Sequence, residues 1–391
     1  MHKKEELTRQ LRLLKEEAGS HSPSLFTIKE AIPDLKVKVD ACFLSNPYAT
    51  DLFLDFFKRE LLDTGGLRDL LEFYPSQNRV IAESLSAAIG IHPDNIFIGN
   101  GAIEIIQTVI QRYTKSKIII NIPTFSSYYE FINDNVEVVY NKLLKENNYE
   151  LDIVEYIALV KKERPDTVVL INPNNPNGAY MDSEKIHYLL RELRDVKNFI
   201  LDESFIHFAY ENEYYDLKTA SNLVYKFPNL ILVKSMSKDF GIAGIRAGYA
   251  VMNSRRVQEL LLNGFLWNSN GLSEYFFRLY TRDEFLKEYE HVRVKYIKET
   301  QEFIKQLRLI PNIKVYPSMA NFALVEILSG ESSDDFVFNM LIDHGVYLRT
   351  CSDKIGLNGE FVRLASRTKA ENQYIIECFN KIGQGNIKLT T

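Results

Sequence analysis

Short apolar runs alternate with amphipathic stretches through the middle of this chain. The runs are rich in Val, Ile and Leu, and most of them end at turn-forming residues, which is typical of buried strands. They lie at residues 96–98, 117–120, 136–140, 167–171, 199–201, 230–234 and 248–251. Between them, apolar residues at helical spacing predict helices at residues 104–113, 183–193 and 220–227. The alternation predicts an α/β fold with a mostly parallel sheet.

The two ends of the chain follow other patterns. Residues 3–18 are predicted to form a helix with Leu7, Leu11 and Leu14 on one face, and the Gly-Ser-His-Ser-Pro stretch at residues 19–23 breaks it. We predict that residues 1–45 form an N-terminal arm that packs on another domain or subunit.

A change of pattern near residue 271 indicates a second domain. A long helical stretch at residues 272–307 comes first. Predicted strands at residues 313–316, 322–326, 346–349 and 361–364 and a final helix near Lys369 follow. The domains expected are therefore the arm, a large α/β domain at residues 46–270 and a small α+β domain at residues 271–391.

Composition narrows the class of protein. The chain has 391 residues, with 46% hydrophobic and 25% charged residues, which are ordinary globular values. Its net charge of −5 gives no basic surface for nucleic acid, and no apolar run approaches the roughly 20 residues that cross a bilayer. Three cysteines lie far apart without a Cys-x-x-Cys pair, and seven histidines show no ligand spacing. We expect a cytoplasmic protein with free thiols and no structural metal.

The most informative segment runs from Ser235 to Tyr249 and reads Ser-Met-Ser-Lys-Asp-Phe-Gly-Ile-Ala-Gly-Ile-Arg-Ala-Gly-Tyr. It places a nucleophilic amine, Lys238, near the hydroxyl of Ser235 and the guanidinium of Arg246. An amine beside such an anion site suits pyridoxal 5′-phosphate (PLP), with the lysine on its aldehyde and the other two groups on its phosphate.

This segment resembles the fold-type I PLP enzymes, the class I/II aminotransferase superfamily. Within it, the chain looks closest to histidinol-phosphate aminotransferases and their decarboxylating relatives, over most of residues 44–378. The resemblance implies an aspartate aminotransferase-like fold, PLP as cofactor, and a homodimer with shared active sites.

Further motifs match the family's cofactor residues. The turn Ile98-Gly99-Asn100-Gly101-Ala102-Ile103-Glu104 would cradle the PLP phosphate with the backbone of its residues Gly101, Ala102 and Ile103. In the segment Pro-Thr-Phe-Ser-Ser-Tyr, Phe125 matches the aromatic residue that stacks on the pyridine ring. In Asn-Pro-Asn-Asn-Pro-Asn-Gly, Asn175 matches the residue that bonds the cofactor's phenolic oxygen.

Two more residues complete the implied cofactor set. Asp202, at the end of a predicted buried strand, would pair with the pyridinium nitrogen. Tyr74, in a Tyr-Pro segment, matches the tyrosine that reaches the phosphate of the neighbouring subunit. Many family members carry a tyrosine three residues after the aspartate, where this chain has Phe205, as some decarboxylating relatives do.

The substrate side is implied by the last predicted strand. Arg363 matches the family's carboxylate-binding arginine. Arg-Leu-Ala-Ser-Arg-Thr at residues 363–368, which includes Arg367, resembles threonine-phosphate decarboxylases more than histidinol-phosphate aminotransferases, as does the segment around Arg349. Asn321 lies in a more widely shared segment and is assigned to the same side. These residues would bind a phosphorylated amino acid.

The predicted function is therefore PLP-dependent decarboxylation of a phosphorylated hydroxy-amino acid. The chain has Ser20-His21-Ser22-Pro23 where threonine-phosphate decarboxylases carry a His-Gly-Gly-Asn segment. We favour L-serine phosphate, giving ethanolamine phosphate as in capsule or surface-glycan pathways, over L-threonine phosphate. Two alternatives stay open: a transaminase of histidinol-phosphate type, and a PLP-binding regulator without turnover. The retained Lys238 and the lack of an evident DNA-binding extension argue against a regulator without turnover.

Overall fold

The structure is a computed structural model that describes residues 2–265 and 267–385. Packing divides the chain into two compact units. The larger unit comprises Ser45–Asn175 and Ala179–Tyr296, and the smaller unit comprises Met1–Leu44, Pro176–Gly178 and Ile297–Thr391. Helix α12 (Asp283–Leu307) contributes to both units. Residues 271–296 group with the larger unit, because aromatic side chains of this stretch, such as Phe276 and Phe285, join its core.

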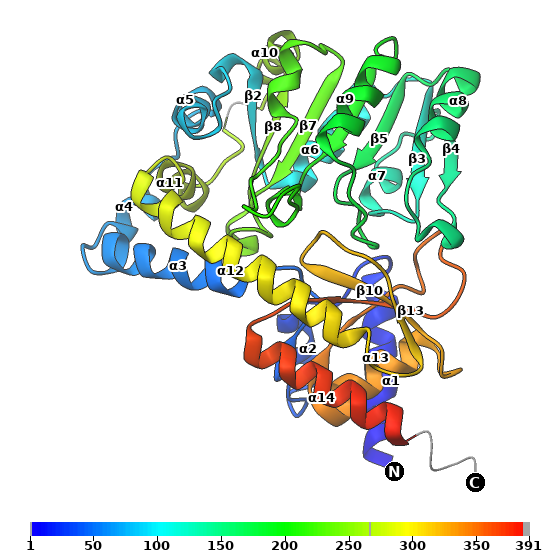
Figure 1. The fold of residues 1–391 in the computed structure, drawn as a ribbon. Coiled ribbons are helices and arrows are strands. Elements are labelled where there is room, and N and C mark those ends of the chain that lie inside the picture. Colours follow the sequence, from blue (N-terminus) through cyan, green and yellow to red (C-terminus); the bar gives the residue numbers. More distant parts are fainter. Residues whose placement is uncertain (1, 266, 386–391) are drawn as a thin grey trace. The chain divides into compact units, whose positions relative to one another are not determined.

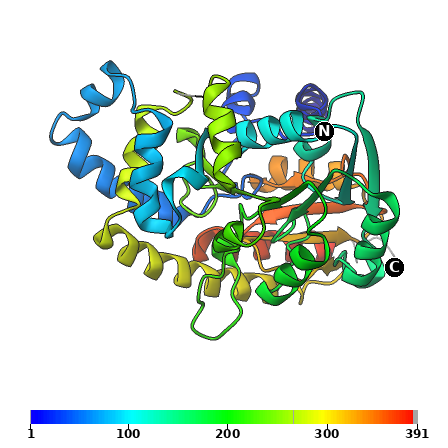
Figure 2. The same ribbon diagram turned by 90° about the horizontal axis from the view of Figure 1, so that it is seen from above.

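The larger unit is built on a seven-stranded sheet with the strand order β2-β8-β7-β6-β5-β3-β4 (Figures 1 and 2). Its strands are β2 (Ile96–Asn100), β3 (Lys117–Ile122), β4 (Glu137–Lys142), β5 (Thr167–Ile171), β6 (Asn198–Asp202), β7 (Leu230–Ser235) and β8 (Ala247–Met252). Strand β8 runs antiparallel to β2 and β7, and the other neighbouring pairs are parallel. The predicted mostly parallel sheet is therefore confirmed.

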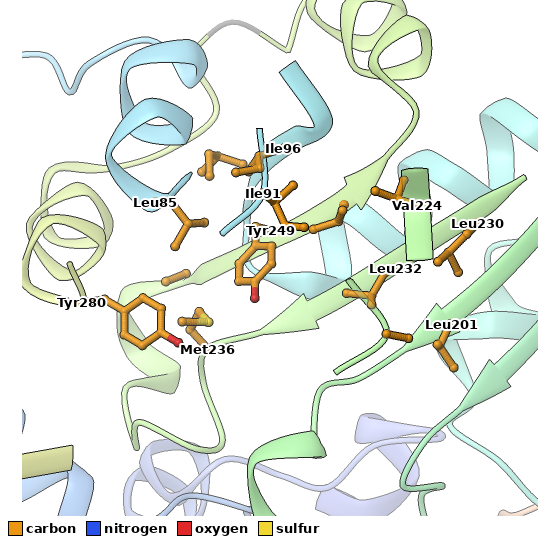
Figure 3. Packing of buried hydrophobic residues seen from close by; sticks show 14 of the residues in the cluster. Leu85, Ile91, Ile96, Leu201, Val224, Leu230, Leu232, Met236, Tyr249 and Tyr280 are labelled. Carbon is orange, nitrogen blue, oxygen red and sulfur yellow. The ribbon is translucent and has the colours of Figure 1, made fainter. Parts of the chain in front are cut away.

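Apolar clusters cover both faces of this sheet. One face packs against α3 (Pro47–Phe57), α5 (Asn78–Ile89), α8 (Ile153–Glu163), α9 (Ser183–Glu192) and α11 (Gly271–Leu279). Figure 3 shows part of this cluster, where Met236 lies beside Tyr280 and Leu232 lies between Tyr249 and Leu201. The other face packs against α6 (Ala102–Tyr113), α7 (Ser127–Glu130) and α10 (Ser254–Leu262). Because both faces are covered, the central strands are apolar throughout rather than alternating.

Side-chain caps fix where several of these helices begin. Asn46, Asp152 and Asp182 accept hydrogen bonds from first-turn amides of α3, α8 and α9. Such caps satisfy backbone donors that the helix itself leaves unpaired, and each is worth about 1 kcal/mol. Helix α6 differs, because its N-cap is Gly101 and no side chain caps it.

The smaller unit has its own sheet, with the antiparallel order β12-β13-β10-β9. Its strands are β9 (Ile313–Val315), β10 (Phe322–Ile327), β12 (Arg349–Thr350) and β13 (Phe361–Ala365), while β1 (Val39–Asp40) pairs with β11 (Val346–Tyr347). Helices α13 (Ser333–His344), α14 (Lys369–Gly385) and the second half of α12 pack with this sheet.

The N-terminal arm packs within the smaller unit. Its helices α1 (His2–Ala18) and α2 (Leu25–Ala31) bury Leu11 and Ile28 against Phe338 and Leu341 of α13. Lys4 pairs with Asp343 at 2.6 Å across the same contact. The arm therefore adds its own apolar cluster to this unit.

Local differences from the predicted elements have physical causes. The stretch predicted as one helix at residues 272–307 is two helices, α11 and α12, interrupted at residues 280–282, where α12 restarts with acidic residues in its first turn. Residues 221–225 form a 3₁₀ helix, and the strand predicted at 346–349 is split into β11 and β12. Helix α4 (Leu67–Glu72) was not predicted, because it has only six residues and none of them is fully buried, although Leu67 and Leu70 pack against the large core cluster. Within residues 2–265 and 267–385, no helix has the length and apolar character that crossing a membrane requires.

Candidate active site

Several chain segments meet at one edge of the large sheet because of the strand directions. The parallel strands β2, β5, β6 and β7 end at this edge, and the antiparallel β8 begins there. In the register, Asn100 lies opposite Ala247, and Ser235 lies opposite Gly248. The edge therefore gathers the predicted cofactor residues Gly101, Asp202, Ser235 and Arg246, where ligands bind in open α/β sheets.

Two glycines let Arg246 and the start of α6 approach each other closely. A Cβ atom on Gly101, whose φ is 78°, would lie 2.6 Å from Nη2 of Arg246. A Cβ atom on Gly248 would lie 2.7 Å from the amide nitrogen of Ala102. Only glycine fits at either position. The guanidinium of Arg246 is thus held against the turn that precedes α6.

The first turn of α6 completes an anion cradle. No side chain caps this helix, so the amides of Ala102 and Ile103 are suited to donate hydrogen bonds to a bound anion. Ser235 is buried, and its Oγ accepts a hydrogen bond from the amide of Ser237 at 3.2 Å. The acidic Glu104 is engaged nearby, since its Oε2 accepts from the amide of Asn100 at 2.7 Å.

Asp202 is a buried carboxylate at the end of β6. The hydroxyl of Tyr128 donates to its Oδ2 at 2.9 Å, and the amide of Ser204 donates to its Oδ1 at 2.8 Å. Burial raises the pKa of Asp202, and these hydrogen bonds oppose that rise. Both donors are neutral, so a cationic ligand group would complete the charge balance. The role of Tyr128 was missed from sequence, although it lies three residues after Phe125.

Lys238 lies on the turn after β7, half-buried between buried neighbours. Its carbonyl oxygen accepts a hydrogen bond from the amide of Asn46 at 2.9 Å, and the hydroxyl of Thr50 donates to the carbonyl of Gly241 at 2.9 Å. The start of α3 therefore holds the turn that carries Lys238, and sequence reasoning did not assign Asn46 this role.

Two loops that carry predicted cofactor residues are tied together at the same edge. The hydroxyl of Thr124 donates to Oδ1 of Asn174 at 3.0 Å, and Nδ2 of Asn174 donates to the carbonyl of Pro123 at 3.1 Å. These bonds place Phe125, which is partly buried, and Asn175, which is buried, on adjoining loops. Tyr74 stands apart, since 93% of it is exposed.

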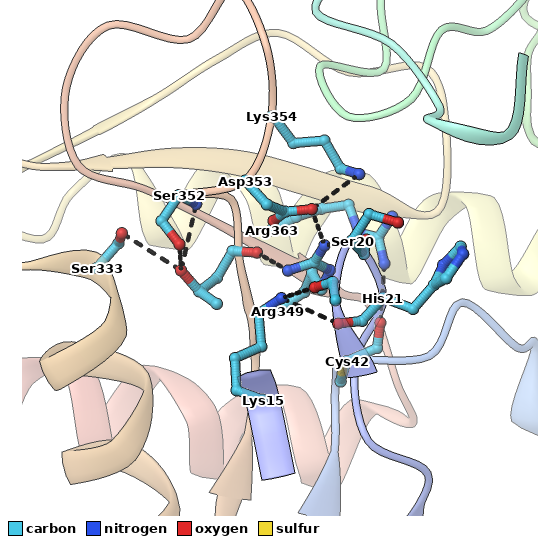
Figure 4. Close-up of polar contacts among 12 residues, drawn as sticks. Lys15, Ser20, His21, Cys42, Ser333, Arg349, Ser352, Asp353, Lys354 and Arg363 are labelled. Carbon is cyan, nitrogen blue, oxygen red and sulfur yellow. Dashed lines mark hydrogen bonds and ion pairs between the residues drawn. The ribbon is translucent and has the colours of Figure 1, made fainter. Parts of the chain in front are cut away.

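The predicted substrate residues lie in the smaller unit, where two arginines oppose each other. Arg349 of β12 is the cross-strand partner of Arg363 of β13. Like charges in that position repel unless anions offset them. Arg349 donates to Asp353 at 2.7 Å and to the carbonyl of Ser20 at 2.8 Å, and Arg363 donates to the carbonyl of Cys42 at 3.0 Å (Figure 4). The arm thus supplies oxygen atoms to both guanidinium groups.

Positive charge exceeds negative charge around these arginines. The amine of Lys354 lies 3.2 Å from the carboxylate of Asp353, which also forms an ion pair with Arg349, so two cations share one acid. Burial, followed by the nearby charge of Arg349, lowers the pKa of Lys15, which lies at the end of α1 in Figure 4. The cluster is therefore suited to an anion of more than one charge.

Arg367 and Asn321 occupy neighbouring positions in the same unit. Nδ2 of Asn321 donates to the carbonyl of Leu44 at 3.3 Å, and the amide of Ser366 donates to the carbonyl of Asn321 at 2.8 Å. Arg367 is partly buried, with its Nε 3.9 Å from Glu371. Contacts within the smaller unit therefore position both side chains: Leu44 holds the amide of Asn321, and Glu371 lies beside the guanidinium of Arg367.

Glu203, beside Asp202, gives a testable pH dependence. Its carboxylate accepts from the amide of Ala220 at 2.8 Å, and burial raises the pKa of Glu203 to about 7. The folded protein holds this proton to higher pH than the unfolded chain. Glu203 therefore stabilises the fold at low pH, and this contribution is lost as the pH rises through about 7. Glu203→Gln is expected to gain up to about 3 kcal/mol in free energy of unfolding relative to the parent between about pH 5 and 8.

Urea unfolding at a series of pH values measures this difference. Glu213→Gln, at an exposed acid of the same unit, is the matched control and should follow the parent. Parallel curves for Glu203→Gln and the parent would show that Glu203 ionises normally in the fold.

Comparison with known proteins places the chain in a family. The family model described as aminotransferase class I and II matches residues 45–379. The chain belongs to the class I and II aminotransferase family. The predicted superfamily is thereby confirmed, and the N-terminal arm lies almost wholly outside the matched part.

Within this family, the chain is similar to named decarboxylases. It is 59% identical over 371 residues to "L-serine phosphate decarboxylase Cj1436c" of Campylobacter jejuni, covering 95% of each chain. It is 48% identical over 377 residues to "L-serine phosphate decarboxylase" of Sulfurospirillum multivorans, covering 96% of each. A histidinol-phosphate aminotransferase of Thermoanaerobacter pseudethanolicus is 34% identical over 301 residues, covering 76% of this chain and 80% of the relative.

A solved structure confirms the fold. The structure of a decarboxylase from Sulfurospirillum multivorans superposes with a TM-score of 0.93 and 48% identity, covering 97% of each chain. The predicted α/β fold of the aminotransferase-like type is therefore correct, including the large sheet and the α+β region that follows it.

Proposed function

We propose that this protein decarboxylates L-serine phosphate to ethanolamine phosphate with pyridoxal 5′-phosphate as cofactor. The observation that carries the proposal is the similarity, over nearly the whole chain, to two proteins named L-serine phosphate decarboxylase. The edge of the large sheet supports it independently, because it offers an amine, an anion cradle and a buried carboxylate together.

The residues at this edge fit the cofactor. Gly101, Ala102, Ile103, Ser235 and Arg246 would hold its phosphate, since a Cβ atom at Gly101 would fill the space against the Arg246 guanidinium. Asp202 would hold a proton on the ring nitrogen, Phe125 would stack on the ring, and Asn175 would donate to its phenolic oxygen. The bound cofactor supplies an electron sink for the pair left when a bond at Cα breaks.

The chain's own residues then select and complete the reaction. Arg363 and Arg349, with Arg367 and Asn321, would bind the carboxylate and phosphate of the substrate and fix which Cα bond is broken. The bond between Cα and the carboxylate breaks and CO2 leaves. Lys238 would donate a proton to Cα, so that the product keeps its amine and phosphate.

A homodimer completes this proposal. Leu71, Phe73, Tyr74 and Trp267 are exposed large side chains. A Cβ atom on Gly271 would lie 2.5 Å from the carbonyl of Leu70, so the start of α11 adjoins the segment that leads to Tyr74. A second copy of the chain would cover these residues and bring Tyr74 to its partner's phosphate site. The three free, buried cysteines agree with a reducing, cytoplasmic location.

Product analysis tests the activity. Purified protein with pyridoxal phosphate is incubated with L-serine phosphate, with L-threonine phosphate, or with histidinol phosphate and a keto acid. The expected result is CO2 release and ethanolamine phosphate from L-serine phosphate without a keto acid. Keto-acid-dependent amine transfer from histidinol phosphate, with both phospho-amino acids inert, would establish the transaminase instead. Absence of turnover with every substrate would favour a binding protein.

The two anion sites should respond differently to loss of their arginines. Arg246→Ala is expected to weaken cofactor retention at least about tenfold, because a charge-assisted contact to the phosphate is lost. Arg363→Ala is expected mainly to raise KM for the amino acid, by about tenfold or more, with the cofactor retained. Dialysis followed by absorbance, together with steady-state kinetics, measures both. The reverse ranking would mean that the two sites are exchanged.

A further inference from the structure

A buried ion pair lies directly beneath the turn that carries Lys238. Lys234, the next-to-last residue of β7, pairs with Asp239, and the two residues are 2% and 0% exposed. They flank Lys238 in sequence, so their contact closes the turn from Ser235 to Asp239. Buried pairs of this kind are costly to desolvate, and hydrophobic residues often replace them without loss of stability. A role beyond stability is therefore worth testing.

The pair lies on the opposite face of the sheet from Asp202. Side chains alternate along β7, and Leu232 and Met236 belong to the cluster on one face while Val233 belongs to the other. Lys234 shares the face of Leu232, whereas Tyr128, the partner of Asp202, belongs to the other cluster. Lys234 therefore does not contact the proposed cofactor face, and it acts on Lys238 through its charge and through its contact with Asp239.

The surroundings of the pair are buried and aromatic. The rings of Phe240 and Tyr289 stack at 4.1 Å, and Nδ1 of His207 lies 2.9 Å from the hydroxyl of Tyr289 and 3.6 Å from Asp239. One carboxylate oxygen of Asp239, Oδ1, is buried without a hydrogen-bond partner among the described residues. Charges in such a place act strongly on their neighbours.

The groups that face the pair come from every surrounding element. Burial and the charge of Lys234 lower the pKa of His207, which keeps the imidazole neutral. Burial raises the pKa of Asp239, and Lys234 and Lys238 both oppose that rise. The remaining titratable neighbours are Asp202, Glu203, Tyr249, Tyr280, Tyr289 and Arg293. Lys234 is thus a buried cation among several acids, and Asp239 is the acid that also acts on Lys238.

We propose that Lys234 and Asp239 form a positioning pair for Lys238, which holds its turn and balances the charge beside its amine. The inference rests on the proposed role of Lys238 with pyridoxal phosphate. In the intact pair the two charges largely cancel at Lys238. With Asp239 neutral, the positive charge of Lys234 is no longer cancelled at Lys238, and it repels a proton on the Lys238 nitrogen.

The pH titration of the bound cofactor's absorbance in the holoenzyme tests this pair. Asp239→Asn is expected to lower the midpoint of that titration by about one pH unit, and Lys234→Met to raise it. The double variant Lys234→Met with Asp239→Asn removes both charges and should return to within about 0.3 unit of the parent. Lys226→Met, at an exposed lysine of the same unit, is the control.

The outcomes separate the pair from the activity. The proposal is overturned if the midpoint of Asp239→Asn equals that of the parent. It is also overturned if the double variant shifts as much as Asp239→Asn does. A pair that only supports the fold would not give the expected pattern of opposite shifts that cancel. If Asp239→Asn does not fold, Lys234→Met decides, and an unchanged or lowered midpoint overturns it. A parent protein that shows no absorbance of a cofactor bound to Lys238 would instead refute the proposed function. Kinetics should show kcat reduced several-fold in the double variant with KM unchanged.

Discussion

Lys238→Ala is expected to lower kcat by at least about 10³-fold while the protein stays folded. The variant loses both the amine that would bind the cofactor aldehyde and the group that would return a proton to Cα. The side chain is only half-buried, and the turn is held through its backbone by Asn46. Thermal unfolding of the variant without cofactor should therefore match that of the parent.

Borohydride reduction followed by peptide mapping tests, without any turnover assay, whether Lys238 is the amine that binds the cofactor aldehyde. In the parent, the reduced cofactor should be attached to the peptide that contains Lys238, and Lys238→Ala should carry no label. Lys218→Ala, at an exposed lysine of the same unit, should be labelled and active like the parent. A label on another lysine, or unchanged activity in Lys238→Ala, would contradict the assignment.

Asp202→Asn is expected to have the second largest effect, a loss in kcat of about 10²- to 10⁴-fold. The amide keeps the size of the side chain and can still accept from the amide of Ser204, but it removes the negative charge. A ring nitrogen that is no longer held protonated accepts electrons poorly. Steady-state kinetics and the dissociation constant of the cofactor would both be measured.

Tyr128→Phe is the matched control, because it separates the effect of the charge of Asp202 from the effect of the hydrogen bond that Asp202 accepts from Tyr128. It deletes the hydroxyl that donates to Asp202 but keeps the carboxylate, and phenylalanine fits the same buried space. We expect its kcat to remain within about tenfold of the parent. Equal losses in Asp202→Asn and Tyr128→Phe would show that orientation of the side chain, rather than its charge, matters at this position.

Much of the cofactor edge was predictable because it depends on local pattern. Apolar strands followed by turns place their end residues at one edge of a parallel sheet, so Gly101, Asp202 and Ser235 were expected together. Arg246 joins them because β8 runs the opposite way, which the sequence does not indicate by itself. The interruption between α11 and α12 was missed, since residues 280–282 contain neither glycine nor proline.

Contacts between distant residues could not be read from the chain. The opposition of Arg349 and Arg363 depends on the register of two strands. The carbonyl oxygens of the arm to which both arginines donate belong to residues more than 300 positions earlier in the chain. Lys234 looks like an ordinary strand-end lysine until the fold places Asp239 against it. Long-range register and buried charge pairing are properties of packing, and a single sequence carries little signal for either.

The reversed direction of β8 has a consequence for the edge of the sheet. Strand β2 is an edge strand, held on one side by its ladder with β8 alone. A phosphate gripped by the start of α6 and by Arg246 would bridge the two strands at the end of that ladder. Amide hydrogen exchange in β2 should therefore slow when the cofactor is bound, and fraying should begin there when it is lost.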